Sequence, residues 1–388
     1  MLPRGGVSER AVPGECRDHT VGNAVARGPD RVDVGREQAR SISTSSGREY
    51  VSAMSRVVVT GCAGMIGSHL VDALLTDEHA AVVGIDDLSF GSTTNLAGVL
   101  GHPRFQFHQA DVQDVEAVGR LCREAGTIVH LAAVKKIGEK EPGARTLRVN
   151  THGTENVLEA AKAWGAKVVL ASTSDVYGMA PVPHKEDGNL LLGPSTVKRW
   201  AYAVSKLYDE QLAFAYHKDE GVPVVVLRYF GGFSPRSSTS WSGGHIPIFI
   251  DALLRDAPIT IHGDGSQTRS MAHVADLVRG TIAAMKAKAA VGEIINLGND
   301  EEVSVLDSAR LIRDVVEEVT GLKRELRLEF VPMQRLFGGY TEIPRRVPDL
   351  SKARRLLDYA PRYTFREAVA ETVKARYAVL QREDGLHS

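Results

Sequence analysis

From residue 56 onward, short apolar runs alternate with segments in which apolar positions recur at a helical period. The runs are rich in valine and isoleucine, and they predict buried strands at 56–60, 81–86, 104–111, 127–133, 167–173 and 222–230. The segments between them, such as SHLVDALLTD and NTHGTENVLEAAKAWG, place their apolar residues on one face and predict helices. This alternation predicts an α/β protein built on a doubly wound parallel sheet.

The two ends of the chain follow other patterns. Residues 1–53 are rich in Gly, Arg, Ser and Pro without an apolar period, which predicts a disordered tail, and Met54 is an alternative start. Residues 231–242 read as a Ser- and Gly-rich loop, and a strand, GEIINLG, and a helix near 304–320 follow later. These later elements predict a smaller C-terminal α/β lobe that is interleaved with the main sheet.

Composition narrows the class of protein. The formal net charge of -1 gives no electrostatic reason to expect nucleic acid or an anionic membrane as a partner. No apolar run reaches the ~18 residues that span a bilayer. The three cysteines, Cys16, Cys62 and Cys122, match no zinc or disulfide framework, so we predict reduced thiols, no metal site and a cytoplasmic protein.

A glycine-rich turn follows the first predicted strand. In TGCAGMIGSHL, Gly61, Gly64 and Gly67 permit a tight turn and a close approach to a pyrophosphate at the start of a helix. Asp86 ends the second strand, 19 residues beyond Gly67, where a carboxylate accepts hydrogen bonds from ribose hydroxyls and repels a 2′-phosphate. We therefore predict a Rossmann domain that binds NAD rather than NADP; the alternative for Asp86 alone is a strand-end cap.

A second group of residues suggests redox chemistry on a hydroxyl. Tyr202 and Lys206 lie four residues apart on a predicted helix, so they share a face. A lysine ammonium beside a phenol is expected to lower the pKa of the phenol, which can then take a proton from a sugar hydroxyl. Thr173 ends a strand and can bind the reacting oxygen, while Asp175 is a further acid or base, or else a turn-stabilising residue.

Together these segments resemble the extended short-chain dehydrogenase/reductase family, in its NAD-dependent epimerase/dehydratase branch. The resemblance runs from about residue 56 to about residue 373 and rests on VVVTGCAGMIGSHL, GIDDLSFGST, ADVQD, IVHLAA, VNTHGTENVLEAA, ASTSDVYG, YAVSK, LRYF, GDGSQTRSMAHVAD, INLGN and RRVPDLSKARRLL. It implies a tail over 1–53, an NAD-binding domain over 54–230 completed by about 267–300, and a substrate-binding lobe from 231–266 and 301–388.

The resemblance also implies which residues form the site. The implied catalytic set is Thr173, Tyr202 and Lys206, and the residues themselves add Asp175 as a further acid or base. The implied NAD contacts are Gly61, Gly64, Met65, Ile66, Gly67, Asp86, Asp87, Ser89, Gly91, Asp111, Val112, Leu131, Ala132, Ala133, Lys135, Asn150, Tyr202, Lys206 and Tyr229. The implied substrate contacts are Lys135, Thr173, Ser174, Asp175, Phe230, Arg269, Arg346 and Asp349, with Arg269 on the diphosphate and the last two on the nucleotide.

The substrate implied by the resemblance is a nucleotide-diphosphate sugar that is oxidised transiently at C4, in a homodimer formed through a four-helix contact. Three outcomes stay open. We favour a 4-epimerase similar to those of UDP-glucose and UDP-glucuronate, then a 4,6-dehydratase, then a UDP-glucuronate decarboxylase. A sensor that binds NAD without turnover is the non-enzyme alternative.

The departures from the family pattern set this order. Ser174 leaves the carboxylate pair of many dehydratases incomplete, although Asp175 approximates the glutamate of others and of the decarboxylases. The segment NLLLGPSTVKRWAYAVSK looks like the decarboxylases, yet Gly244 stands where those carry an arginine. Gly231 and Ser234 replace a substrate-contacting Asn and a Gly in RYFGGFSPR.

Overall fold

The computed structural model describes residues 56–76, 78, 80–135, 143–238, 244–332 and 342–385. For residues 383–385 it describes the backbone alone. The predicted tail, the possible start at Met54 and Cys16 lie outside the described residues. Among the residues that are described, no helix combines the length and the apolar character needed to cross a bilayer.

Seven strands form the central sheet in the order β11-β6-β5-β4-β1-β2-β3, and all neighbouring pairs run parallel. Strand order reverses between β1 and β4, as in a doubly wound sheet, which confirms the predicted fold class. The strands are β1 (Val57–Thr60), β2 (Val82–Asp86), β3 (Phe105–Gln109), β4 (Thr127–His130), β5 (Lys167–Thr173), β6 (Val224–Tyr229) and β11 (Glu293–Leu297).

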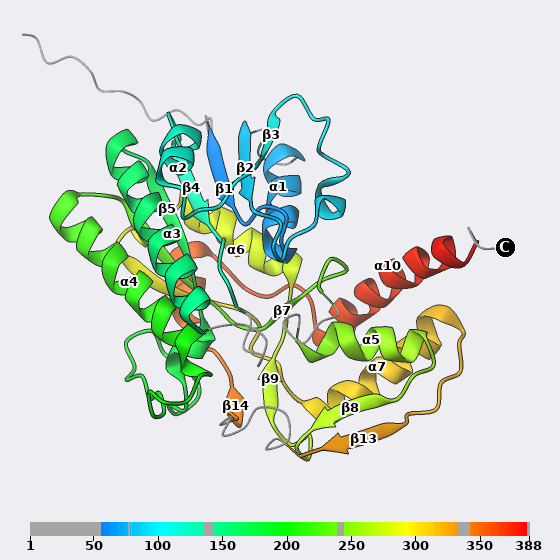
Figure 1. Ribbon diagram of the computed structural model, residues 1–388. Coiled ribbons are helices and arrows are strands. Elements are labelled where there is room, and N and C mark those ends of the chain that lie inside the picture. The colour runs from blue at the N-terminus through cyan, green and yellow to red at the C-terminus, as the bar shows by residue number, and fades with distance from the viewer. Residues whose placement is uncertain are drawn as a thin grey trace, which may run out of the picture. The chain divides into compact units, whose positions relative to one another are not determined.

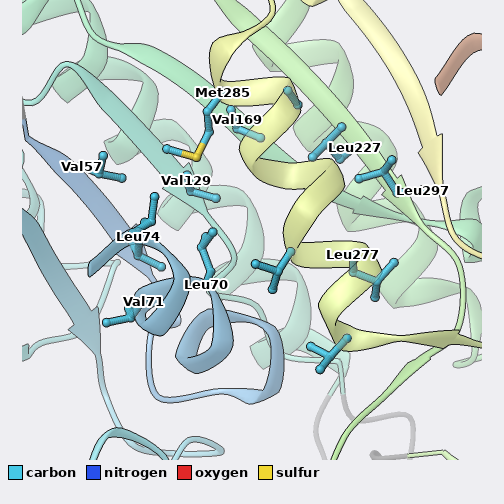
Figure 2. Close-up of a cluster of buried hydrophobic side chains, with 14 of the residues drawn as sticks. Val57, Leu70, Val71, Leu74, Val129, Val169, Leu227, Leu277, Met285 and Leu297 are labelled. Carbon is cyan, nitrogen blue, oxygen red and sulfur yellow. The ribbon is translucent and has the colours of Figure 1, made fainter. Parts of the chain in front are cut away.

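Helices cover both faces of this sheet (Figure 1). On one face α1 (Met65–Thr76) and α6 (Val274–Lys286) bury an apolar stripe, in which Leu70 and Leu74 meet Val129 and Leu277 (Figure 2). On the other face α2 (Val115–Leu121), α3 (Gly143–Trp164) and α4 (Trp200–Glu220) pack through a second core that includes Leu158. A sheet buried on both faces explains why its strands are continuous apolar runs rather than alternating ones.

The C-terminal part has a core of its own. It contains α5 (His245–Leu254), α7 (Val305–Thr320), α10 (Phe365–Gly385), the parallel pair β8 (Ile259–His262) and β13 (Leu328–Val331), and the three-stranded sheet β12 (Glu302–Ser304), β9 (Thr268–Ser270) and β14 (Arg345–Arg346). Local chemistry sets the ends of α7, because Ser304 Oγ accepts a hydrogen bond from the Asp307 amide at 2.9 Å and Gly321 follows with a φ of 73°. The domain boundaries drawn from the sequence stay a prediction.

Candidate functional site

A cavity of about 590 Å³ lies at the carboxyl ends of the parallel strands, beside the start of α1. Ligands of open α/β sheets bind at this edge, next to the reversal of strand order. Most of the predicted site residues line the cavity: Gly61, Gly64, Met65, Ile66, Gly67, Asp86, Asp87, Ser89, Gly91, Asp111, Val112, Leu131, Ala132, Ala133, Lys135, Thr173, Ser174, Asp175, Tyr202, Lys206, Tyr229, Phe230 and Arg346.

The glycine turn leaves no room for side chains. Gly61 has a φ of 70°, and a Cβ added there would lie 2.8 Å from the backbone nitrogen of Ala132. A Cβ on Gly67 would collide with the carbonyl oxygen of Gly61. The turn therefore forms a backbone cradle at the N-terminus of α1, and this cradle fits the pyrophosphate of a dinucleotide.

We predict that Gly67→Ala abolishes NAD binding, because the added methyl group must push the Gly61 carbonyl out of the cradle. Isothermal titration with NAD measures the loss. Gly119→Ala in α2 is the matched control, since a Cβ there meets nothing within 4 Å and NAD affinity should not change. NAD bound with unchanged affinity by Gly67→Ala would contradict this account of the cradle.

Asp86, the predicted ribose ligand, is bonded to the turn that forms the cradle. Its carboxylate accepts hydrogen bonds from the backbone amides of Ala63 and Leu88, both at 2.9 Å. Burial raises the pKa of this carboxyl, and the two amides oppose the shift. Each oxygen keeps a further lone pair, so the carboxylate can hold the turn and still accept from a ribose hydroxyl.

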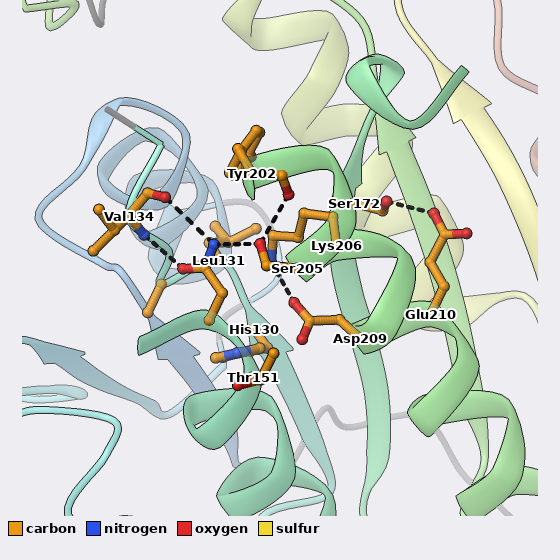
Figure 3. A network of polar contacts seen from close by, with 12 residues as sticks. His130, Leu131, Val134, Thr151, Ser172, Tyr202, Ser205, Lys206, Asp209 and Glu210 are labelled. Carbon is orange, nitrogen blue, oxygen red and sulfur yellow. Dashed lines mark hydrogen bonds and ion pairs between the residues drawn. The ribbon is translucent and has the colours of Figure 1, made fainter. Parts of the chain in front are cut away.

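Tyr202 and Lys206 both project from α4 into the cavity wall (Figure 3). The expected lowering of the Tyr202 pKa by Lys206 is wrong for this structure. Burial raises the pKa of Tyr202, Asp175 and Asp209 raise it further, and a hydrogen bond with Thr173 opposes them. Burial is the largest cause, and the Lys206 ammonium that was expected to oppose it is paired with a carboxylate of its own, with Nζ 3.1 Å from Asp209. When bound, an oxidised nicotinamide supplies both a hydride acceptor and a positive charge to this site.

Asn150 lies behind the cavity wall rather than in it. It is fully buried, accepts from the Val134 amide at 2.8 Å and donates to Ser205 Oγ at 2.8 Å, and is not among the residues that line this cavity. It thus ties the loop after β4 to α4, and its predicted contact with NAD stays a prediction. Tyr229 does line the cavity, with its hydroxyl 2.7 Å from Thr281 Oγ1.

Asp175 is a buried carboxylate surrounded by cations. Its Oδ1 lies 2.6 Å from Arg346 Nη2 and 3.7 Å from Arg199 Nη2. Burial alone would raise the pKa of Asp175, but Arg346, Arg199 and Lys135 hold it below its usual value. Asp175 is therefore ionised at neutral pH and serves as an acceptor or a fixed negative charge, and a proton donor must be sought elsewhere.

A second cavity of about 170 Å³ shares Lys135, Asp175 and Arg346 with the first. Arg269 lines it, with its guanidinium on Glu342 and on the carbonyl of Thr268. The sequence analysis missed several further residues of its wall, among them the ionisable Arg199, His245 and Glu342. The one sequence signal for Arg199 is its spacing: it precedes Tyr202 by three residues, which places both side chains on one face of a helix.

Two predicted substrate contacts are placed differently from expectation. Arg346 reaches Asp175 at the junction of the two cavities, rather than a separate nucleotide site. Asp349 lines neither cavity, and its Oδ1 accepts from the Ser351 amide at 2.8 Å at the start of α9 (Ser351–Leu357). At Gly231 a Cβ would stand 2.5 Å from the Met271 sulfur, so the family's Asn side chain would need a shift there.

Comparison with known proteins places this site in a family. The profile of the NAD dependent epimerase/dehydratase family matches residues 57–298. A UDP-N-acetyl-alpha-D-glucosaminuronate decarboxylase of Bacillus cytotoxicus is 33% identical over 323 residues, which cover 82% of this chain and 97% of the relative. UDP-glucuronic acid decarboxylase 1 of Xenopus tropicalis is 36% identical over 82% of this chain and 71% of the relative.

A solved structure supports the same family assignment. The Bacillus cereus UDP-glucuronic acid 4-epimerase, crystallised with UDP-glucuronic acid and NAD, superposes with a TM-score of 0.71 at 32% identity, over 84% of this chain and 99% of that one. The predicted enzyme class and NAD cofactor are thereby confirmed, whereas the relatives support decarboxylation better than the favoured epimerisation. The chain belongs to the NAD-dependent epimerase/dehydratase family.

Proposed function

We propose that this enzyme oxidises C4 of a nucleoside-diphosphate hexuronate and releases carbon dioxide from the resulting keto acid. The single observation that carries the proposal is the buried, ionised Asp175 among Lys135, Arg199 and Arg346, next to Thr173 and Tyr202. Such a cationic site suits a substrate with both a diphosphate and a carboxylate. The decarboxylases among the relatives support the same substrate class.

The residues present can carry the chemistry in the following order. Thr173 holds the C4 hydroxyl while Tyr202 takes its proton, and the cradle and Lys206 would hold NAD, which would supply the hydride acceptor at C4. The C4 ketone is β to the carboxylate, so the C5–C6 bond can break with release of carbon dioxide, leaving its electron pair in an enolate that extends over C4 and C5. C5 then takes up a proton from water, the hydride is returned to C4, and Tyr202 returns its proton to the C4 oxygen.

A uronate 4-epimerase is the second candidate, and Gly244 favours it. The family resemblance implies an arginine at that place in decarboxylases, whereas here Gly244 precedes α5 with a φ of 83° and lines the second cavity. The neighbouring His245 does not replace the cation, because burial lowers its pKa to about 3 and leaves it neutral. Without a proton donor for C5, the keto acid could rotate and accept the hydride on its other face.

A substrate screen separates these outcomes. The protein is incubated with NAD and the UDP-, GDP-, dTDP- and ADP-linked forms of glucuronate, N-acetylglucosaminuronate and glucose, and the products are read by mass spectrometry and NMR. Loss of carbon dioxide from a uronate supports the proposal. An unchanged mass with a new sugar signal identifies an epimerase, loss of water a dehydratase, and no turnover on any donor favours a sensor.

We predict that Asp175→Asn lowers kcat by about a hundredfold, because two arginines lose their counter-charge beside the reacting sugar. The lowered pKa of Asp175 means that its ionised form persists as the pH falls through the usual aspartate range and is lost only below it. The kcat of the native enzyme should therefore not fall through protonation of Asp175 at mildly acidic pH. Asp314→Asn, at an exposed ion pair, is the control; equal rates for Asp175→Asn and the native enzyme would contradict the prediction.

The quaternary structure and the cytoplasmic location remain predictions as well. Leu147 on α3 and Val204 and Tyr208 on α4 are exposed apolar side chains, and they support a contact between two copies through these helices.

A further inference from the structure

The ammonium of Lys206 has a buried carboxylate as its partner. Lys206 Nζ lies 3.1 Å from Asp209 Oδ2, one turn further along α4, and the two side chains are 2% and 0% exposed (Figure 3). Among the described residues, Lys206 makes no second ion pair with a carboxylate. The same ammonium also lines the cofactor cavity. Asp209 and a bound cofactor therefore share its three N–H groups as hydrogen-bond donors.

The surroundings leave Asp209 dependent on Lys206. The adjacent carboxylate, Glu210, is neutralised by Arg228 at 2.7 Å. His130, on the β4 side, is neutral, because burial and the nearby Lys206 lower its pKa to about 3. Besides Lys206, the hydroxyl of Thr154 faces Asp209 and favours its ionised form, but it carries no charge. Lys206 is therefore the one cation that offsets the Asp209 charge in this part of the described structure.

We propose that Asp209 is a positioning residue, which shares the Lys206 ammonium with the cofactor and thereby sets the pH range in which Tyr202 accepts a proton. This inference rests on the role of Tyr202 as the base in the proposed function. It differs from that function in naming a residue that touches neither substrate nor cofactor and acts through Lys206.

Electrostatics gives the direction of the effect. Among the described residues, the charged groups that act on Tyr202 include Asp209 on its own helix and Asp175 after β5, with the hydroxyl of Thr173 beside them, and Lys206 lines the same cavity. Asp209 cancels much of the positive charge through which Lys206 would favour phenolate. Burial raises the pKa of Asp209 itself despite Lys206, so this carboxylate takes up a proton at a higher pH than an exposed one. Removing the charge should move the titration of Tyr202 to lower pH.

The test is a titration of the full-length protein saturated with NAD. The phenolate absorbance of Tyr202 is obtained as the difference between each protein and its counterpart carrying Tyr202→Phe. Asp209→Asn should shift this titration to lower pH by about one unit, the size expected from a nearby charge. Asp209→Glu keeps the charge and should restore the native curve. Glu220→Gln, which removes a charge at an exposed pair on the same helix, should leave the curve unchanged.

A native-like titration in Asp209→Asn overturns the inference. Asp209→Ala gives a second neutral variant if the amide destabilises the protein; should both unfold while Asp209→Glu folds, Asp209 is structural and the inference also fails. No sugar enters the titration. A protein that leaves every uronate unchanged can therefore still show the shift, and a proven decarboxylase can lack it, so this inference and the proposed function fail separately.

Discussion

Tyr202→Phe is expected to lower kcat by about a thousandfold while leaving NAD affinity within about twofold of the native value. The ring of Tyr202 is 8% exposed, so phenylalanine keeps its packing and removes only the oxygen that takes the proton. Hydride cannot leave C4 efficiently unless the hydroxyl proton leaves with it. The loss should therefore appear in kcat and in kcat/KM alike.

Single-turnover formation of NADH on the best substrate of the screen measures this loss directly. Tyr216→Phe is the matched control, because Tyr216 lies on the same helix and its hydroxyl donates to Glu159 at an exposed site. Its kcat should equal the native one. Turnover within about tenfold of native in Tyr202→Phe would remove Tyr202 from the role of base.

Arg228→Met should reduce the free energy of unfolding by about 3–5 kcal/mol, the usual cost of stripping the partner from a buried charge. Arg228 donates to both Glu210 oxygens, at 2.9 and 2.7 Å, and the two side chains are 4% and 3% exposed. Ser172 Oγ donates to the same carboxylate at 2.5 Å, so one network joins β5, β6 and α4. Its loss leaves the buried Glu210 uncompensated on α4, the helix that also carries Tyr202.

Urea unfolding of the variant measures this loss. Arg345→Gln is an informative control. Arg345 also donates to both oxygens of its partner, Glu302, at 2.8 Å each, but its side chain is 56% exposed. Solvent screens such a pair, so its removal should cost far less. Equal losses in the two variants would show that burial does not govern the Arg228 network.

Much of the site was predictable because local sequence builds it. The strand, the glycine turn and the helix are contiguous, so the cradle for NAD follows from a dozen neighbouring residues. Tyr202 and Lys206 are likewise joined by one turn of helix. The distant Arg346 was found as a substrate contact only by resemblance, and its ion pair with Asp175 was not foreseen.

The resemblance assigned Asn150 and Asp349 to ligands, and these assignments stay predictions; in the structure both side chains accept hydrogen bonds from backbone amides. The pKa of Tyr202 was expected to fall because only Lys206 was considered. In the folded chain burial, Asp175 and Asp209 raise that pKa, and Asp209 pairs with Lys206. Sequence spacing shows which residues share a helix face. It does not show which neighbouring carboxylate pairs with the Lys206 ammonium.

The sequence by itself determined the parallel α/β sheet, the NAD cradle and the family, because apolar periodicity and short-range turn geometry encode them. Tertiary structure decided the electrostatics of the site: the pairing of Lys206 with Asp209, and the convergence of Arg199, Arg346 and Lys135 on Asp175. These residues come from separate segments, and the charge that each one feels depends on distance and burial, which only the folded chain defines.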